Sequence, residues 1–421
     1  MSSLKIVVMG LGYVGLPTAT VFASRRIEVL GVDVNEHAIN TINSGNIHIV
    51  EPALDIAVRA AVTEGYLKAA LEPAPADAFM IAVPTPFKDN KEPDMICVES
   101  ATRSIAPFLE KGNLVVLEST SPVGTSEQIS AWLAEERPDL SFPHSAGEDS
   151  DIRIAHCPER VLPGHVIREL VENDRVIGGI TPKCAQQAQA LYKRVVQGEC
   201  VITTARTAEM AKLTENSFRD VNIAFANELS MICDHLDINV WEMIRLANRH
   251  PRVSILTPGP GVGGHCIAVD PWFIVDSAPD QARLIRLARE VNDYKPEWVL
   301  EKVEQALAKI HSEQPSRSRQ DLKVACLGVA FKPNIDDLRE SPALHIAQAI
   351  SKLGSQVLVV EPNVKSLPNC LITASIEHVN LSDALAQADV VCVLVRHSLF
   401  DEHAHSINAA AVVIDTVGLA G

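Results

Sequence analysis

Short hydrophobic runs alternate with longer segments of helical spacing from Lys5 onward. The runs KIVVMG, EVLGVD, AFMIAVPTP and NLVVLEST are rich in Val and Ile, and RIAHCPE extends the series to about residue 160. Buried strands that alternate with helices are typical of βαβ units and a parallel sheet. The first part of the chain is therefore predicted to be a doubly wound α/β domain.

The pattern changes between roughly residues 207 and 310. Two stretches, TAEMAKLTENSFRDVNIAFANELSMICDHL and ARLIRLAREVNDYKPEWVLEKVEQALAKI, have helical spacing and few strand signals. They predict a helical connector, in which Pro296 should start a new helix or kink an existing one because proline lacks an N–H. The polar stretch HSEQPSRSRQD that follows predicts an exposed linker.

A second set of strands follows this linker. LKVACLG, QVLVVE, DVVCVLV and AVVIDT repeat the order of the first set, and EVLGVD and QVLVVE share a terminal acidic residue. Chance is the alternative explanation, since buried parallel strands resemble one another in composition. The predicted fold has two Rossmann-like doubly wound parallel-sheet domains, residues 1–205 and 312–421, joined by a central helical segment, residues 206–311.

Length, charge and cysteine usage exclude several classes of protein. The chain has 421 residues, 47% of them hydrophobic, which suffices for two or three domains. Its formal net charge of −16 argues against a nucleic-acid partner, which needs a basic face. The nine cysteines form no CxxC pair, so we expect reduced thiols and a cytoplasmic location. We also expect no membrane insertion, because no window offers about 20 apolar residues.

The motif GLGYVG follows a predicted strand and precedes a predicted helix, the context in which GxGxxG binds a dinucleotide. Gly10 permits the tight turn, Gly12 lets backbone approach a pyrophosphate, and Gly15 allows close packing of helix on strand. Asp33 ends the next strand and is placed to bind the adenosine ribose, which favours NAD, although two arginines nearby leave NADP as an alternative. The second domain has only Gly328 in the corresponding place and is expected to bind another ligand.

The stretch GPGVGGHCIAVD places Cys266 after a cluster of glycines. Glycines keep the thiol accessible, but a nucleophilic cysteine also needs a cation, a base or a helix end beside it. Spacing alone therefore leaves a nucleophile and a small buried residue as alternatives. Asp270 shares a face with the cysteine if a helix starts here. No second pair of ligands supports a metal site at His265 and Cys266, so no metal is predicted.

Other polar residues are candidates for a site, and each taken alone is also compatible with a surface or structural role. Lys212 and Asn216 are one helical turn apart and share a face. Glu159 ends a predicted strand, where α/β proteins bind ligands. His250 and Arg252, in NRHPRV, belong to a basic cluster suited to phosphate.

In combination, the motifs resemble the UDP-glucose/GDP-mannose dehydrogenase family over nearly the whole chain. The ordered set is GLGYVGLP, VPTP, ESTSPVGT, CPER, AEMAKLTENSFRDVNIAFANE, GPGVGGHC and FKPNIDDLRESP. NIHIVEPAL, PERVLPG, ANRHPRV and GGHCIAVDPWFIV are most similar to members that act on UDP-N-acetyl-D-mannosamine. The resemblance implies an NAD-binding first domain, a UDP-sugar-binding last domain and a homodimer formed through the central helices. It also implies a place in polysaccharide biosynthesis, such as that of enterobacterial common antigen.

The resemblance implies an NAD-dependent four-electron oxidation of the sugar at C6, from alcohol to carboxylate. Cys266 matches the nucleophile that captures the aldehyde as a thiohemiacetal and carries the later thioester. Lys212 and Asn216 match donors to the oxyanion, and Asp270 and Glu159 match carboxylates that handle water and protons. The cofactor residues implied are Gly10, Gly12, Tyr13, Val14, Gly15, Asp33, Pro84, Thr85, Ser119, Thr120 and Arg339. The substrate residues implied are Glu159, Arg160, Lys212, Asn216, Arg219, His250, Arg252, Gly263 and Lys332.

Two departures from the family pattern bear on the substrate. UDP-glucose dehydrogenases typically carry a glutamate where this chain has Pro163 and a lysine where it has Val269. Both changes argue against UDP-glucose and leave UDP-N-acetylglucosamine as the rival of the manno sugar. Two further classes remain as alternatives, a non-catalytic nucleotide-sugar-binding protein and a two-electron dehydrogenase of the 6-phosphogluconate type.

Overall fold

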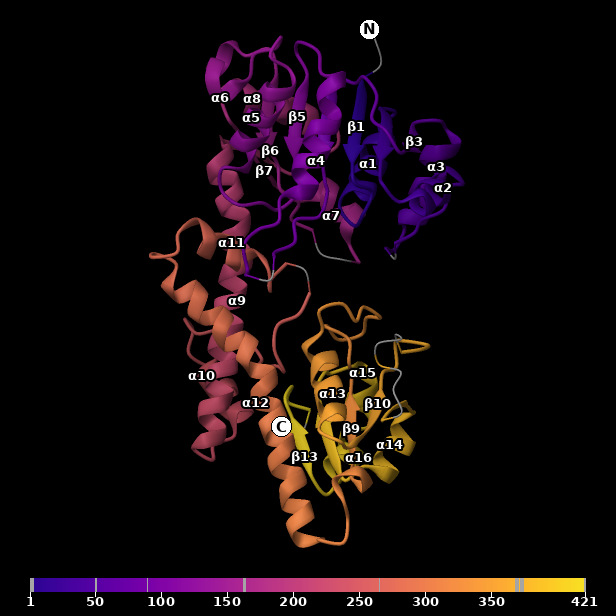
Figure 1. Cartoon of the computed structure of the whole chain (residues 1–421), viewed down its shortest axis with the longest axis vertical. Coiled ribbons are helices and arrows are strands. Elements are labelled where there is room, and N and C mark those ends of the chain that lie inside the picture. Colours follow the sequence, from indigo (N-terminus) through magenta and orange to yellow (C-terminus); the bar gives the residue numbers. More distant parts are fainter. Residues whose placement is uncertain are drawn as a thin grey trace. The chain divides into compact units, whose positions relative to one another are not determined.

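The chain divides into two compact units, each with its own sheet (Figure 1). The computed structural model describes residues 4–49, 51–88, 90–161, 164–264, 266–367, 371 and 375–419. Unit 1 contains residues 1–215 and 272–279, and unit 2 contains residues 216–271 and 280–421.

The sheet of unit 1 contains eight described strands in the order β3-β2-β1-β4-β5-β6-β7-β8. All neighbouring strands pair in parallel except β6 and β7, which are antiparallel. The strand order reverses between β1 and β4, so the switch point lies at the carboxyl ends of these two strands. The sheet is doubly wound, as predicted. The strands are β1 (Lys5–Met9), β2 (Glu28–Val32), β3 (Leu67–Ala70), β4 (Ala78–Ile81), β5 (Leu114–Leu117), β6 (Arg153–His156), β7 (Arg175–Gly179) and β8 (Cys200–Thr204).

Helices cover both faces of this sheet because successive strand residues point to opposite sides. Ile6 and Val8 of β1 belong to one hydrophobic cluster, while Val7 and Met9 belong to another. The first cluster includes α1 (Gly15–Ala23), α2 (Glu36–Asn43), α3 (Leu54–Thr63), α7 (Val166–Glu172) and α8 (Pro182–Tyr192). The second includes α4 (Ile96–Ile105) and α5 (Thr125–Glu136), and the shorter helices of unit 1 are α6 (Pro143–Ala146), η1 (Ala106–Phe108) and η2 (Gly147–Asp149).

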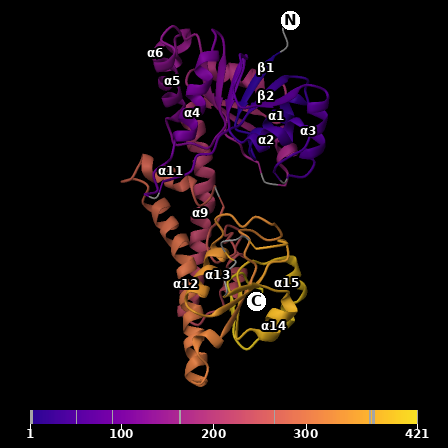
Figure 2. The same cartoon turned by 45° about the vertical axis from the view of Figure 1, so that its right-hand side comes forward.

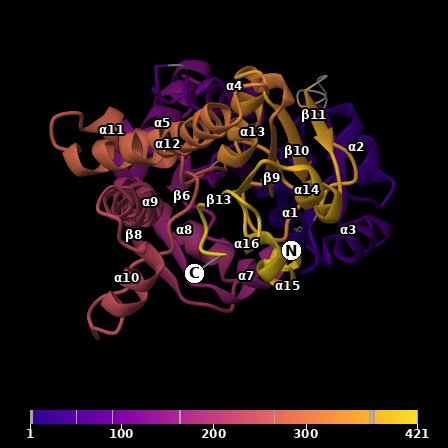
Figure 3. The same cartoon turned by 90° about the horizontal axis from the view of Figure 1, so that it is seen from below.

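Unit 2 carries the second sheet, whose described strands are all parallel in the order β11-β10-β9-β12-β13. Helices α12 and α13 pack on one face, with α13 between α12 and the strands in the view of Figure 3, and α14 to α16 pack on the other. This arrangement confirms the predicted second α/β fold. The elements are β9 (Lys323–Leu327), β10 (Gln356–Val360), β11 (Ile376–His378), β12 (Val390–Val393), β13 (Val413–Asp415), α13 (Pro342–Lys352), α14 (Leu381–Gln387), α15 (Ser398–Glu402), α16 (Ala404–Asn408) and η3 (Arg319–Asp321).

The central segment is helical, as predicted. It consists of α9 (Ala205–His235), α10 (Val240–Ala247), α11 (Asp270–Ser277) and α12 (Arg283–Glu313). The part of α9 that belongs to unit 2 runs beside α12 (Figure 2). Helix α12 continues through Pro296, so the expectation that a new helix starts there was wrong. None of the helices that the structure describes is long and apolar enough to cross a membrane.

The sequence pattern missed the strands β3, β7, β8 and β11. β7 ends in Gly178 and Gly179, which weaken a strand signal but are required by packing. A Cβ at Gly178 would lie 2.4 Å from the carbonyl oxygen of Thr204, and one at Gly179 would lie 2.3 Å from that of Thr181. The remaining missed strands are short or partly exposed, so hydrophobic runs do not mark them.

A buried polar cluster joins α9 to α12 in unit 2. The Arg289 guanidinium, 1% exposed, lies 2.6 Å from Oδ1 of Asp220, which is 0% exposed. Asn292 donates to the same oxygen at 2.8 Å and accepts from Asn227 at 2.9 Å. A buried ion pair of this kind fixes the pairing of two helices, because removing one partner leaves the other charge desolvated.

We expect Asp220→Ala to lower the free energy of unfolding by about 3–5 kcal/mol, because Arg289 would keep only Asp293 as an acidic partner. Urea unfolding followed by circular dichroism measures the change. Glu290→Ala, at an exposed position next to Arg289, is the matched control and should change the value by less than about 0.5 kcal/mol. Equal effects of the two substitutions would contradict the prediction.

Candidate active site

The glycine loop after β1 is packed at two positions and open at the third. Gly10 has φ +87°, and a Cβ there would lie 2.7 Å from the Ala82 carbonyl oxygen. A Cβ at Gly15 would lie 1.8 Å from the carbonyl oxygen of Gly10. At Gly12, nothing lies within 4 Å of the added carbon. The loop therefore needs Gly10 and Gly15 for its own fold, while Gly12 leaves free space for a ligand next to backbone.

Asp33 follows β2 and binds the same loop. Its Oδ2 accepts from the Leu11 amide at 2.8 Å, and its Oδ1 accepts from the Asn35 amide at 2.9 Å. Burial lowers the pKa of nearby His48, although the Asp33 charge acts in the opposite direction. A neutral histidine beside Asp33 offers no charge to a 2′-phosphate, so this corner of the site fits NAD better than NADP.

The loops after β4 and β5 are cross-linked by two hydrogen bonds. Thr85 Oγ1 donates to the carbonyl oxygen of Thr120 at 2.6 Å, and Ser119 Oγ donates to that of Val83 at 2.6 Å. These loops and the glycine loop meet the carboxyl edge of the sheet on both sides of the switch point, where doubly wound folds bind ligands. Of the remaining cofactor candidates, Tyr13, Val14 and Pro84 lie in the same loops of unit 1, whereas Arg339 belongs to unit 2, where it pairs with Asp337 at 2.7 Å.

The open position at Gly12 gives a prediction that separates binding from folding. We expect Gly12→Val to reduce NAD affinity at least about 100-fold, because the valine side chain would occupy the space through which the pyrophosphate approaches the backbone. The melting temperature should stay nearly unchanged. Fluorescence titration with NADH and thermal unfolding measure the two effects. Gly15→Val is the comparison and should lower the melting temperature, because its side chain meets the backbone of Gly10. Undiminished NADH binding by the Gly12 variant would contradict this use of the loop.

Glu159 and Lys212 interact electrostatically within unit 1. Glu159 follows β6, and its Oε1 accepts from the backbone amide of Val161. Burial raises the pKa of the Glu159 carboxyl, while the charge of Lys212 on α9 opposes the rise. Arg160, the next residue, pairs with Glu215 of α9 at 2.6 Å. A carboxylate whose pKa is raised is a stronger base than an ordinary glutamate, which suits a general base.

Two buried polar residues of unit 1 were not identified from the sequence. His156 is buried, and burial lowers its pKa to about 3, so its ring is uncharged at ordinary pH. Glu51 is also buried, and its carboxylate accepts from the amides of Gly164 and Val166 at 2.9 Å each. Glu51 thereby holds the loop after Glu159, and only the stretch NIHIVEPAL hinted at it. Pro163, one of the family departures, lies outside the described residues.

Cys266 lies in unit 2 and is exposed, so the alternative of a small buried residue was wrong. The amide of Asp270, the first residue of α11, donates to the Cys266 carbonyl oxygen at 2.9 Å. Asp270 itself is buried, and its Oδ2 accepts from Asn216 Nδ2 on α9. The predicted helix after the cysteine is therefore present, and it places a carboxylate one turn beyond the thiol. His265 lies outside the described residues.

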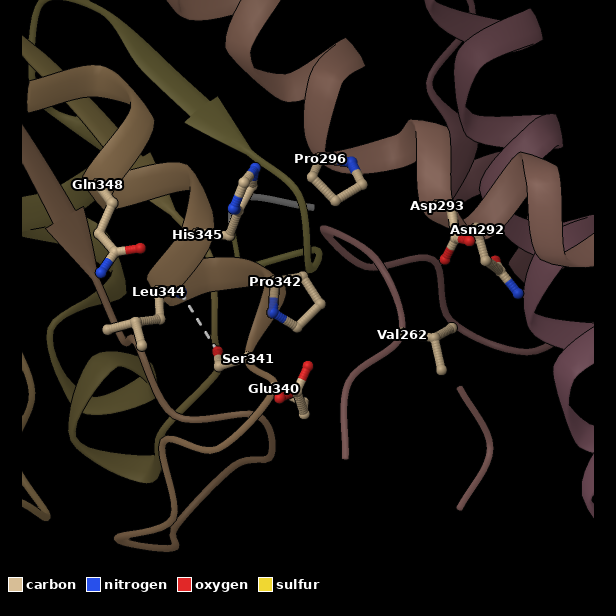
Figure 4. A pocket seen from close by; sticks show the side chains of 10 residues that line it. All are labelled: Val262, Asn292, Asp293, Pro296, Glu340, Ser341, Pro342, Leu344, His345 and Gln348. Atoms are coloured by element: carbon tan, nitrogen blue, oxygen red, sulfur yellow. Dashed lines mark hydrogen bonds between the residues drawn. The ribbon is translucent and has the colours of Figure 1, made fainter. Parts of the chain in front are cut away.

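The glycines before Cys266 are needed because the loop packs tightly. A Cβ at Gly261 would lie 3.0 Å from Pro342 and 3.1 Å from Pro296, and one at Gly263 would lie 2.4 Å from the Glu340 carbonyl oxygen. Figure 4 shows Pro296 and Pro342 beside this loop, near a cavity of about 310 Å³ that Val262 also lines. Asn227 accepts from the loop's Gly259 amide at 2.9 Å, a contact that no sequence motif indicated. Gly263 is thus a packing residue of the loop.

Basic side chains accompany the cysteine in unit 2. Burial and the charge of Arg219 lower the pKa of Lys332, and the Cys266 thiolate opposes this shift. An ammonium that interacts with a thiolate favours the ionised, nucleophilic form of the cysteine. His250 and Arg252 are exposed, and His250 Nδ1 accepts from the Arg252 amide at 3.3 Å. Within the described residues, no three His, Cys, Asp or Glu side chains are grouped as metal ligands.

The two units supply complementary chemistry. Unit 1 has the open glycine loop and ribose-binding acid of a dinucleotide-binding domain, and unit 2 has an exposed cysteine with a lysine and a carboxylate. A glycine loop of this kind is typical of NAD-dependent oxidoreductases. The chain belongs to the UDP-glucose/GDP-mannose dehydrogenase family. Three family models match it: the NAD binding domain at residues 4–196, the central domain at 206–294 and the UDP binding domain at 325–420.

Similar proteins carry two different names. An NDP-N-acetyl-D-galactosaminuronic acid dehydrogenase of Ralstonia nicotianae is 64% identical over 98% of this chain and 96% of its own length. A UDP-N-acetyl-D-mannosamine dehydrogenase of Campylobacter jejuni is 64% identical over 94% of this chain and 96% of its own. The solved UDP-D-ManNAc dehydrogenase of Pyrococcus horikoshii has a TM-score of 0.85 and 37% identity, covering 99% of this chain and 96% of that one. The protein is an NAD-dependent nucleotide-sugar dehydrogenase.

Proposed function

We propose that the protein oxidises UDP-N-acetyl-D-mannosamine at C6 to UDP-N-acetyl-D-mannosaminuronate, in two oxidations per sugar. The observation that carries the proposal is the exposed Cys266 at the start of the turn into α11, with Asp270 one turn later and Asn216 bonded to it. A second oxidation at the same carbon needs a group that holds the aldehyde, and a thiolate does so by forming a covalent adduct.

NAD, when bound at the glycine loop, accepts a hydride from C6 in each oxidation. After the first oxidation, the Cys266 thiolate adds to the C6 aldehyde and forms a thiohemiacetal, whose oxygen carries the developing negative charge. Lys212 and Asn216 stabilise this oxyanion as donors. Lys332 favours the thiolate form of Cys266 before the attack, and together with Arg252 it binds the diphosphate of the substrate.

The second oxidation converts the adduct into a thioester, which water must hydrolyse to release the carboxylate. Glu159 and Asp270 are the carboxylates that accept the proton of this water. The raised pKa of Glu159 supports such a role, since a higher pKa makes the carboxylate a stronger base. Val269 is buried and apolar and contributes no charge to this step. The balance is one alcohol, two NAD and one water giving one carboxylate, two NADH and three protons.

The other assignments follow the same scheme. Residues 1–205 bind NAD, residues 206–311 form the central segment with the cysteine loop, and residues 312–421 bind the uridine diphosphate with Lys332. Arg160, Arg219, His250 and Gly263 surround the sugar nucleotide, and Arg339 lies near the pyrophosphate of NAD. Free thiols in all eight described cysteines support a reducing, cytoplasmic location.

The central helices form the interface of a homodimer in this proposal. Phe218, Phe225 and Ile232 of α9 are exposed and seven residues apart, so they form one apolar stripe along the helix. A stripe of large exposed hydrophobic residues is typical of a surface that another protein covers. Light scattering of the purified chain measures the mass, and a monomer at micromolar concentration would overturn the proposed dimer.

A galacto-configured sugar is the second candidate, because relatives of equal identity carry the two names. The test is the number of NADH formed per sugar nucleotide, with UDP-N-acetylmannosamine, UDP-N-acetylgalactosamine, UDP-N-acetylglucosamine and UDP-glucose supplied separately. Two equivalents with the manno sugar alone are expected. Two equivalents with another sugar would replace the substrate and keep the reaction, and one equivalent would overturn the thioester route. No turnover with any of them would overturn the proposed function.

A further inference from the structure

A buried acid–histidine pair occupies the switch point of the second sheet, where no role has been assigned so far. Glu361 directly follows β10, and His397 follows β12 and precedes α15. Glu361 is 2% exposed and His397 is 0% exposed. His397 Nε2 and Glu361 Oε2 lie 3.1 Å apart. Burial of two such groups is costly unless their remaining hydrogen-bonding positions are used, so their further partners matter.

Glu361 corresponds to Asp33 of the first sheet. Asp33 follows β2 and accepts from a backbone amide of the loop after β1. Glu361 follows β10 and accepts from the amides of Val329 and Ala330, in the loop after β9, at 2.8 and 3.0 Å. The two sheets therefore use an acid in the same way, but only Glu361 also binds a histidine. Burial opposes ionisation of Glu361, yet the hydrogen bonds from His397 and the Val329 amide outweigh it and lower its pKa.

His397 packs closely against the glycine that follows the first strand of the second sheet. Gly328 has φ +81°, and a Cβ there would lie 2.6 Å from Cβ of Val395 and 3.1 Å from Cδ2 of His397. Gly10 is its equivalent in the first sheet: it follows β1, and a Cβ there would lie 2.7 Å from the Ala82 carbonyl oxygen. The His397 ring, which packs edge-on against Phe400 at 5.5 Å, thus takes up space at the switch point of the second sheet.

His397 also holds the loop that carries Lys332. Its Nδ1 accepts from the Asn334 amide at 2.9 Å and lies 3.0 Å from Nδ2 of Asn363. Because Nδ1 faces these donors, the ring proton lies on Nε2 and is donated to Glu361. Asn334 has φ +60°, and its Oδ1 accepts from the Ser398 amide at 2.9 Å. The loop is therefore fixed to the sheet two residues beyond Lys332.

We propose that Glu361 and His397 form a positioning pair, which holds the Lys332 loop in place for the diphosphate of the nucleotide sugar. This inference rests on the proposed function in one respect, the contact of Lys332 with the diphosphate. The pair itself does not touch the reacting atoms. Its effect is on affinity, because a loop that must be ordered on binding costs free energy that an anchored loop does not.

Two substitutions at one position separate the two hydrogen bonds of the ring. His397→Asn keeps an acceptor near Nδ1 for the Asn334 amide, whereas His397→Gln keeps a donor near Nε2 for Glu361 and loses that acceptor. We expect the Gln variant to bind UDP about tenfold more weakly by calorimetric titration, and the Asn variant to stay within about threefold of wild type. Hydrogen exchange of the Asn334 amide should be faster in the Gln variant only. In turnover, the KM for the sugar nucleotide should rise in the Gln variant while the KM for NAD remains.

Asn334→Gly provides a second test of the anchored Lys332 loop if the His397 variants do not fold. The position is exposed and has a positive φ that glycine adopts freely, and the change removes the acceptor for the Ser398 amide. UDP affinity should fall several-fold. Unchanged affinity in both this variant and His397→Gln would overturn the positioning pair, even if the wild type oxidises nucleotide sugars. Weaker UDP binding in a protein that oxidises no sugar would instead support the pair and overturn the proposed function.

Discussion

Cys266→Ala is expected to abolish formation of the sugar carboxylate, a loss of at least about 10⁴-fold in kcat for the complete reaction. The physical reason is that the thiolate that holds the aldehyde would be lost: among the described cysteines, Cys266 is the exposed one that interacts with Lys332. NAD affinity should be unchanged, because the glycine loop lies in unit 1. Mass spectrometry of the sugar products, together with NADH titration, measures both effects.

Cys97→Ala is the matched control for this substitution. Cys97 of α4 is the other exposed cysteine among those that the structure describes, so its removal tests whether any accessible thiol matters. We expect wild-type formation of two NADH per sugar. Full carboxylate formation by the Cys266 variant would rule out the covalent route, and loss of activity in the Cys97 variant would show that exposure alone does not identify the nucleophile.

Lys212→Met is expected to lower kcat by about 10²–10³-fold, the usual effect of removing an oxyanion donor. It should also change the pH profile. Burial raises the pKa of Glu159 and the Lys212 charge opposes the rise, so loss of that charge raises this pKa further. A base works only above its pKa, and the acidic limb of the profile should therefore move to higher pH.

Steady-state rates measured from acidic to alkaline pH give both effects of Lys212→Met. Lys68→Met, at an exposed position in β3, removes the same charge away from Glu159 and should leave the profile in place. A lower kcat with an unmoved acidic limb would separate oxyanion stabilisation from the tuning of Glu159. An unchanged kcat would exclude Lys212 from the reaction.

The sequence predicted both sheets because their central strands are continuous apolar runs, buried on both faces. It missed β7, whose glycines are dictated by contacts with Thr204 and Thr181 that a linear pattern does not reveal. It predicted either a new helix or a kink at Pro296, where α12 continues and the cysteine loop packs against the proline ring within unit 2. In each case a tertiary contact overrides the local preference.

The candidate site residues also divide into those that a local motif marks and those that depend on tertiary contacts. Gly10, Gly12, Gly15 and Asp33 could be found because one local motif in a strand–loop–helix context carries them. Residues such as Glu51 accept from amides more than 100 positions away, and the stretch NIHIVEPAL around Glu51 does not show which amides these are. Asn227 likewise holds the cysteine loop from the interior of a helix. Supporting residues of this kind become visible only when the chain is folded.

The burial of most thiols has a practical consequence. Burial raises the pKa of Cys157 and Cys326 to about 12, so they stay protonated and resist alkylation in the native protein. In a Cys97→Ala background, Cys266 is then the exposed thiol among the described cysteines. A fluorophore or spin label can be attached there without redesign, and protection of that thiol by a bound nucleotide sugar would report occupancy of the site in real time.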